Sequence, residues 1–279
     1  MKDLIKGLRD FKKSYFTKYR ELFEQLSHGQ DPNVLFITCS DSRIDPNLIT
    51  QTDPGELFVI RNAGNIIPPY GAANGGEGAA VEYAIHALGV EHIIVCGHSH
   101  CGAMKGLLHK EKLGEMPLVY DWLNHAEATR RLVQENYRSY SSDELLEIAI
   151  AENVLTQIEN LKTYPVVRSR LYQGNLFIYG WVYMIETGEV LAYDEKTHSY
   201  IPPQTQLEAM SNGHRAEILQ TLAPPVACEL PSNGSDEPIS IVPSSTTPLP
   251  VPATAAAIPG FSGSGWLTPE QAERIYRGS

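Results

Sequence analysis

The sequence is short of cysteine, of long apolar runs and of basic side chains. Four cysteines in 279 residues are too few for a disulfide scaffold. No apolar run reaches the roughly 18 residues that span a bilayer, and residues 1–27 carry charges throughout, so we expect neither a transmembrane segment nor a signal peptide. With 22 basic against 33 acidic side chains, nucleic acid and anionic membranes are not expected partners. These absences predict a soluble cytoplasmic protein with free or metal-bound thiols.

The composition changes near residue 200. Hydrophobic residues make up 42% of the chain, which is enough for a core. Residues 201–279 lack lysine and hold 12 of the 19 prolines. We therefore predict a folded domain (1–200) that begins with a helical arm (1–27), then a helical extension (201–222), a Pro/Ser/Ala-rich, mostly disordered linker (223–265) and a docking peptide (266–279).

The docking peptide has the pattern of a short capped helix. Thr268 is an N-cap candidate and Pro269 suits the first helical position. Because so short a helix is marginal alone, a capped apolar helix on a long tether is typical of a segment that docks on another protein. The alternative is that it folds back on its own domain. The predicted docking residues are Trp266, Leu267, Ile275 and Tyr276.

Apolar patterns in the first 200 residues predict an α/β fold. Short runs apolar on both faces predict buried strands, amphipathic spacing predicts helices, and a turn at 186–189 predicts a closing hairpin. Such alternation indicates a mainly parallel sheet flanked by helices. The expected strands are 33–38, 56–60, 92–96, 175–185 and 190–194, and the expected helices are 76–88, 120–136 and 143–162, the last capped by Ser142 or Asp143.

Metal-ligand side chains follow two of these strands. Cys39 follows the first, and His98 and Cys101 follow the third. Because ligand sites of parallel sheets lie past the carboxyl ends of the strands, we expect the three side chains to meet there. A Cys₂His set leaves a fourth tetrahedral position open, which is the pattern of catalytic zinc. The sequence therefore predicts one Zn²⁺ per chain.

Asp41 and Arg43 alternate with Cys39 in a C-x-D-x-R run. They place a carboxylate near the open position and a guanidinium that binds it at two points. We predict that Asp41 is an ionised acceptor and that Arg43 orients it. Neither C-x-D-x-R nor H-x-x-C is specific alone, and the alternative is a buried thiol with a loop histidine, but the pair behind two strands is a strong signal.

The remaining thiols and one histidine receive simpler interpretations. Cys96 is expected to be a core thiol, and Cys228 a free thiol in the linker. His100 lies between two predicted ligands, and a role in a second layer around the metal stays open. Patterns typical of zinc proteases, nucleobase deaminases and nucleotide-binding loops are missing.

The segments CSDSR (39–43), FVIRNAGN (58–65), EYAIHAL (82–88) and GHSHCG (97–102) resemble the β-class carbonic anhydrases. Together with GWLTPEQAERIYRG at the end, the sequence resembles the carboxysomal branch of that family in cyanobacteria. The resemblance implies zinc-dependent, reversible hydration of CO₂ to bicarbonate and a proton by metal-bound hydroxide. It also implies a role inside the carboxysome, supplying CO₂ to Rubisco, with the tail docked on a scaffold protein.

The resemblance also implies the substrate pocket. Phe58, Ala63 and Tyr83 would form its wall, and Gln30 and the backbone N–H of Gly102 would be donors. Some of these groups come from the other subunit in the family, so a homodimer is the expected minimum unit, with larger oligomers of dimers open. Phe36 stands where relatives gated by bicarbonate carry Trp, which favours the form without that gate.

Two alternatives keep parts of this interpretation. One is a CS₂ or COS hydrolase on the same zinc site. The other is a scaffold-binding protein whose zinc site is inactive or closed. The intact C-x-D-x-R and H-x-x-C runs argue against the second, because nothing structural requires Asp41 and Arg43.

Overall fold

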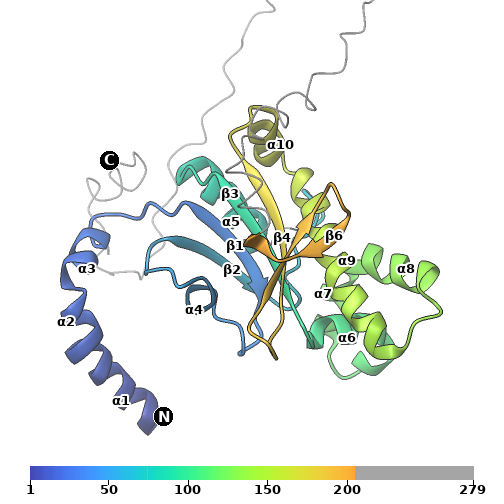
Figure 1. The fold of residues 1–279 in the computed structure, drawn as a ribbon, viewed down its shortest axis with the longest axis horizontal. Coiled ribbons are helices and arrows are strands. Elements are labelled where there is room, and N and C mark those ends of the chain that lie inside the picture. The colour runs from blue at the N-terminus through green and yellow to red at the C-terminus, as the bar shows by residue number, and fades with distance from the viewer. Residues whose placement is uncertain (74, 205–279) are drawn as a thin grey trace, which may run out of the picture. The chain divides into compact units, whose positions relative to one another are not determined.

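The computed structural model describes residues 1–73 and 75–204 (Figure 1). The linker, the docking residues and nearly all of the 201–222 extension lie outside these residues. The described helices are α1 (Lys2–Asp10), η1 (Phe11–Tyr15), α2 (Phe16–Lys18), α3 (Arg20–Leu26), α4 (Pro46–Thr50), α5 (Gly76–Glu82), η2 (Tyr83–Ala87), α6 (Gly102–Leu108), η3 (Lys110–Leu113), α7 (Pro117–Leu123), η4 (Asn124–Ala126), α8 (Glu127–Asn136), α9 (Ser142–Lys162) and α10 (Pro165–Tyr172).

Six strands form one mixed, mostly parallel sheet in the order β2-β1-β3-β4-β5-β6, which confirms the predicted fold class (Figure 1). The strands are β1 (Val34–Cys39), β2 (Leu57–Asn62), β3 (His92–His98), β4 (Phe177–Tyr183), β5 (Val190–Asp194) and β6 (Ser199–Ile201). The first four run parallel, and β4, β5 and β6 follow one another in antiparallel pairs. The hairpin is therefore as expected. The sequence pattern did not reveal β6, because three residues are too few to show a period.

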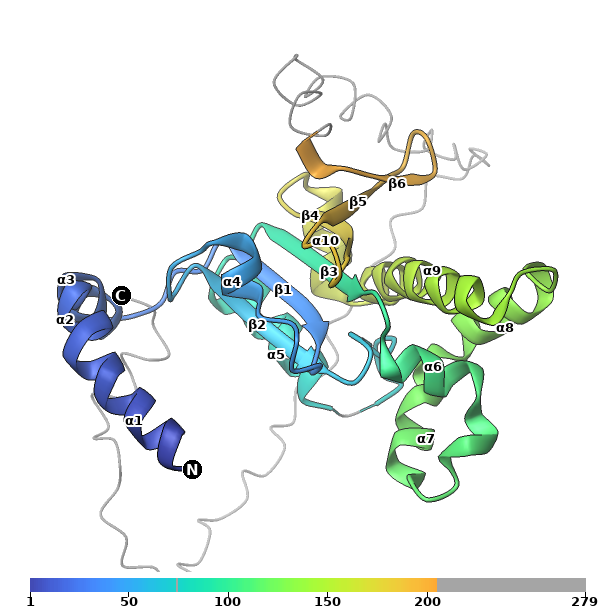
Figure 2. The ribbon, with the colours of Figure 1, turned by 60° about the horizontal axis from the view of Figure 1, so that its bottom comes forward.

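The core lies where α9 packs on the sheet (Figure 2). Its close approach depends on two strand glycines. A Cβ on Gly97 or on Gly180 would lie 3.0 Å from a methyl group of Val154 in α9. On the opposite face of the sheet, Cys96 packs beside Phe36, and burial raises its thiol pKa to about 12, so it is the core thiol that we expected.

Two helix boundaries differ from the expectation. Ser141 caps α9, not Ser142 or Asp143, because the Ser141 hydroxyl accepts from the Glu144 N–H while the Glu144 carboxylate accepts from the Ser141 N–H. The helix expected at 120–136 begins earlier, where Pro117 occupies the first turn, and is interrupted by η4. Lys110 stabilises the interruption by donating to Asn124, the first residue of η4, and to Glu127, the first residue of α8.

Candidate metal centre

The three predicted ligands meet at the carboxyl ends of two neighbouring strands. Cys39 ends β1 and His98 ends β3, and the parallel register that pairs Thr38 with Cys96 brings the two ends side by side. Cys101 follows a short turn and stands directly before α6. The parallel pairing of β1 with β3 therefore brings together predicted ligands that lie far apart in the sequence.

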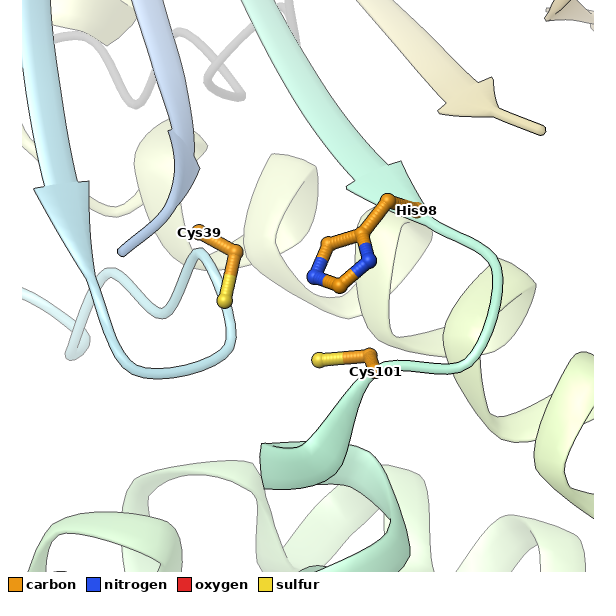
Figure 3. A group of neighbouring side chains, drawn as sticks. All are labelled: Cys39, His98 and Cys101. Carbon is orange, nitrogen blue, oxygen red and sulfur yellow. The ribbon is translucent and has the colours of Figure 1, made fainter. Parts of the chain in front are cut away.

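The ligand atoms of Cys39, His98 and Cys101 lie within 4.8 Å of one another, and all three residues are buried (Figure 3). Nδ1 of His98 lies 2.8 Å from the Ser99 carbonyl oxygen. Because a carbonyl only accepts, Nδ1 carries the proton and Nε2 keeps its lone pair. Nε2 is buried with no hydrogen-bond partner among the described residues. Two thiols and one free imidazole nitrogen suit Zn²⁺.

The two thiols influence each other. Hydrogen bonding from Cys101 lowers the pKa of Cys39, and the same contact with Cys39 raises the pKa of Cys101. The backbone N–H of Gly64 also donates to Cys39 Sγ at 3.4 Å and stabilises its thiolate. Cys39 therefore gives up its proton readily, whereas Cys101 retains its proton. A divalent cation bound to both sulfur atoms would supply the positive charge that lets both thiols ionise.

Asp41 lies at the edge of the cluster and is held by Arg43. Nε of Arg43 donates to Oδ1 at 2.9 Å and Nη2 donates to Oδ2 at 2.7 Å. This guanidinium holds the pKa of Asp41 well below its usual range, so the carboxylate is ionised at neutral pH. Oδ2 of Asp41 lies 3.9 Å from His98 Nε2, which places the carboxylate beside the three ligand atoms.

Arg61 is a site residue that the sequence did not reveal. Its Nε donates to the Cys39 carbonyl at 3.1 Å, and its Nη2 donates to the Asp41 carbonyl at 2.8 Å. It therefore fixes the backbone between the first ligand and the carboxylate. Its position in β2, paired with Thr38, would have placed it near Cys39, but no spacing rule states where its side chain reaches.

Buried amide side chains hold the loop after β2. Nδ2 of Asn153 donates to the Gly64 carbonyl at 2.9 Å, and Gln157 accepts from the Ile67 N–H at 2.9 Å. Asn153 and Gln157 are one turn apart on α9. Polar residues at helical spacing on the otherwise apolar face of this helix were the sequence signal that could have identified them.

The expected pocket residues divide into two groups. Ala63 and Gly102 lie beside the cluster, Ala63 next to the Gly64 donor and Gly102 at the start of α6. Phe58 pairs with Leu35 near the amino ends of the strands, and Gln30 precedes β1, so both lie at the far end from Cys39. Tyr83 packs against Phe58 with ring centroids 6.0 Å apart and is 44% exposed. The chain therefore does not bring this second group to its own cluster.

Comparison with known proteins agrees with the fold and the cluster. The carbonic anhydrase family model matches residues 34–190, and the chain belongs to this family, in its β class. It is 57% identical to a carbonic anhydrase of Synechococcus elongatus over 281 aligned residues, which cover 100% of this chain and 99% of the relative. The chain is therefore a carbonic anhydrase.

Solved structures show the same relationship. The β-carbonic anhydrase CcaA is 65% identical, with a TM-score of 0.72 over 73% of this chain and 99% of that one. A tetrameric β-carbonic anhydrase of Sordaria macrospora is 28% identical, with a TM-score of 0.63 over 68% of this chain and 94% of that one. Within the part of the chain that the structure describes, no helix is long and apolar enough to cross a membrane.

Proposed function

We propose that the chain hydrates CO₂ reversibly with one Zn²⁺ held by Cys39, His98 and Cys101. The observation that carries this proposal is the buried, unpartnered Nε2 of His98 beside two thiols in the described part of the chain. Zinc bound there would supply a nucleophile at neutral pH by lowering the pKa of water. Three protein ligands leave one tetrahedral position for that purpose.

The neighbouring residues orient the reaction. Asp41, ionised and beside the cluster, is an acceptor for a proton-bearing group at the open position. Arg43 fixes both oxygens of Asp41, so that the acceptor keeps one direction. Gly102 is the first residue of α6, and its N–H is one of the helix N-terminal donors that carry partial positive charge. A donor of this kind suits the bicarbonate anion that the reaction forms.

A second copy of the chain would complete the pocket. Gln30, Phe58 and Tyr83 lie away from the cluster of their own chain, which is what a contribution to the other subunit requires. None of the side chains in α1, η1, α2 and α3, all of which the structure describes, is buried. The tetrameric Sordaria relative supports an assembly of several chains, and a homodimer is the minimum unit that we propose.

The proposed location is the carboxysome. There the enzyme would supply CO₂ to Rubisco, and Trp266, Leu267, Ile275 and Tyr276 would dock on a scaffold protein. The support is the full-length similarity to a cyanobacterial carbonic anhydrase, which extends through residues 266–279, together with the capped-helix pattern of that segment.

Stopped-flow measurement of CO₂ hydration, with zinc counted in the same reduced sample, tests the catalytic part. Rapid hydration with about one zinc per chain is expected, as the Cys₂His set implies. One zinc per chain without hydration would contradict the proposed activity. CS₂ offered to the same sample separates the alternative hydrolase, which would turn over CS₂ and leave CO₂ unchanged.

A further inference from the structure

The two residues between His98 and Cys101 are both held by one carboxylate from a distant turn. Ser99 Oγ donates to Oε2 of Glu186 at 2.6 Å, and Nε2 of His100 lies 3.1 Å from Oε1 of Glu186. Glu186 belongs to the turn between β4 and β5. A single side chain therefore spans the loop that carries two of the three metal ligands.

Ser99 connects this carboxylate to His98. Its hydroxyl accepts from the Ile185 N–H at 2.9 Å while donating to Glu186, and its N–H donates to the Tyr183 carbonyl at 2.9 Å. Its own carbonyl accepts from Nδ1 of His98 at 2.8 Å. Fixing Ser99 therefore fixes the imidazole and leaves Nε2 as the nitrogen free to bind a metal.

His100 connects the same carboxylate to Arg43. Its backbone is left-handed, with φ of 54°, a conformation that a non-glycine residue adopts only when its surroundings hold it. In this conformation its carbonyl accepts from Nη2 of Arg43 at 3.3 Å. The contact between His100 and Glu186 thus stabilises the backbone conformation in which the His100 carbonyl contacts Arg43, the residue that holds Asp41.

We propose that Glu186 is a positioning residue for the metal centre. It acts through Ser99 on the orientation of His98, and through His100 on Arg43, without touching the metal or the reacting atoms itself. This inference rests on the proposed zinc site. Its consequence is that zinc leaves faster, and its ligand geometry changes, when the Glu186 carboxylate is removed.

The test uses the full-length zinc-loaded protein and three variants. Glu186→Ala removes the acceptor, and Glu186→Gln keeps an oxygen that can accept from Ser99. Glu189→Ala is the control, because its exposed carboxylate accepts from Thr187 in the same turn but not from the ligand loop. The readouts are the rate of zinc transfer to a chromogenic chelator and the visible absorption of the Co²⁺-substituted protein.

We expect Glu186→Ala to release zinc about tenfold faster or more, the usual effect of losing an outer partner of a ligand. Its Co²⁺ spectrum should differ from that of the parent protein, Glu186→Gln should fall between the two, and Glu189→Ala should match the parent. Wild-type release and an unchanged Co²⁺ spectrum in Glu186→Ala would overturn the inference. A parent protein that binds no zinc would instead overturn the proposed function.

A double-mutant cycle keeps the test decisive if Glu186→Ala folds poorly. Ser99→Ala, Glu186→Met, which removes the acceptor but keeps a side chain of similar length, and their combination are compared by zinc release, with the thermal midpoint of each recorded. Because either substitution breaks the hydrogen bond that leads through Ser99 to His98, the combined variant should release zinc more slowly than the product of the two single effects predicts. Effects that simply multiply would show that Glu186 acts independently of Ser99, and the inference would fail.

Discussion

Arg43 holds Asp41 by both carboxylate oxygens and by its backbone N–H, which donates to Oδ1 at 3.0 Å. The two residues are neighbours in the C-x-D-x-R run, so the contact is local, but it reaches the cluster through Oδ2, 3.9 Å from His98 Nε2. An ionised acceptor is therefore kept beside the metal ligands in a fixed direction. The role proposed for Asp41 follows from this contact.

Replacing Asp41 with Asn should preserve zinc and reduce turnover. Asn cannot be the ionised acceptor and pairs less well with Arg43, so we expect kcat for CO₂ hydration to fall about a hundredfold or more. Zinc content and stopped-flow rates are measured together, with the exposed Asp53→Asn as control. Undiminished hydration at neutral pH would remove Asp41 from the mechanism.

Gly64→Ala should destabilise the metal centre more than its backbone strain alone explains. Gly64 has φ of 86°, and an added Cβ would lie 2.9 Å from Met104 Cε and 3.1 Å from Ala103 Cβ. We expect a loss of about 2 kcal/mol in the free energy of unfolding, and faster zinc release because the same residue donates to Cys39.

Gly71→Ala is the matched control for that variant. Gly71 has a similar φ of 79°, but an added Cβ would meet nothing within 4 Å. Gly71→Ala therefore measures the cost of the left-handed backbone without the clash. Equal destabilisation of the two variants, with equal zinc release, would show that the packing around Gly64 is unimportant.

The Glu127→Gln variant should be less stable than the parent protein at neutral pH, and this difference in stability should disappear in acid. Arg130 and then Lys110 lower the pKa of Glu127 to about 2. A depressed carboxyl pKa stabilises the fold above the ordinary pKa, and this contribution disappears as the pH falls toward about 2. Because the side chain is partly exposed, we expect about 1 kcal/mol or less. Thermal midpoints from pH 7 downward check this, with Glu135→Gln as control; a difference that persists at the lowest pH would contradict it.

Truncation after Gln204 should separate catalysis from docking. This cut keeps all six strands of the described sheet and the three ligands, so CO₂ hydration should be unchanged, while capture by carboxysome scaffold protein should be lost. Pull-down and hydration are measured on the same preparations. Truncated protein that still enters carboxysomes would show that the tail is not the docking element.

The sequence predicted the parallel sheet and the ligand cluster for one reason. Strands apolar on both faces indicate a parallel sheet, and such a sheet places the residues after neighbouring strands together, so Cys39, His98 and Cys101 could be joined without a structure. The Asp41–Arg43 contact was also within reach, because its partners are two residues apart.

Contacts between distant segments were beyond such reasoning. Glu186 meets Ser99 only because β4 lies beside β3, and no pattern around residue 186 marks that carboxylate. The N-cap of α9 was misplaced by one residue because three successive residues, Ser141, Ser142 and Asp143, can all cap, and only the hydrogen bonds with Glu144 decide among them.

Zinc K-edge X-ray absorption of the purified protein tests the central claim most directly. With Cys39, His98 and Cys101 as ligands, the spectrum should show two sulfur scatterers at about 2.3 Å and two nitrogen or oxygen scatterers at about 2.0 Å. Cys39→Ser should lose zinc or one of the sulfur scatterers, whereas Cys96→Ala should match the parent. Zinc without sulfur ligands, or an unchanged two-sulfur spectrum in Cys39→Ser, would contradict the assignment of the site.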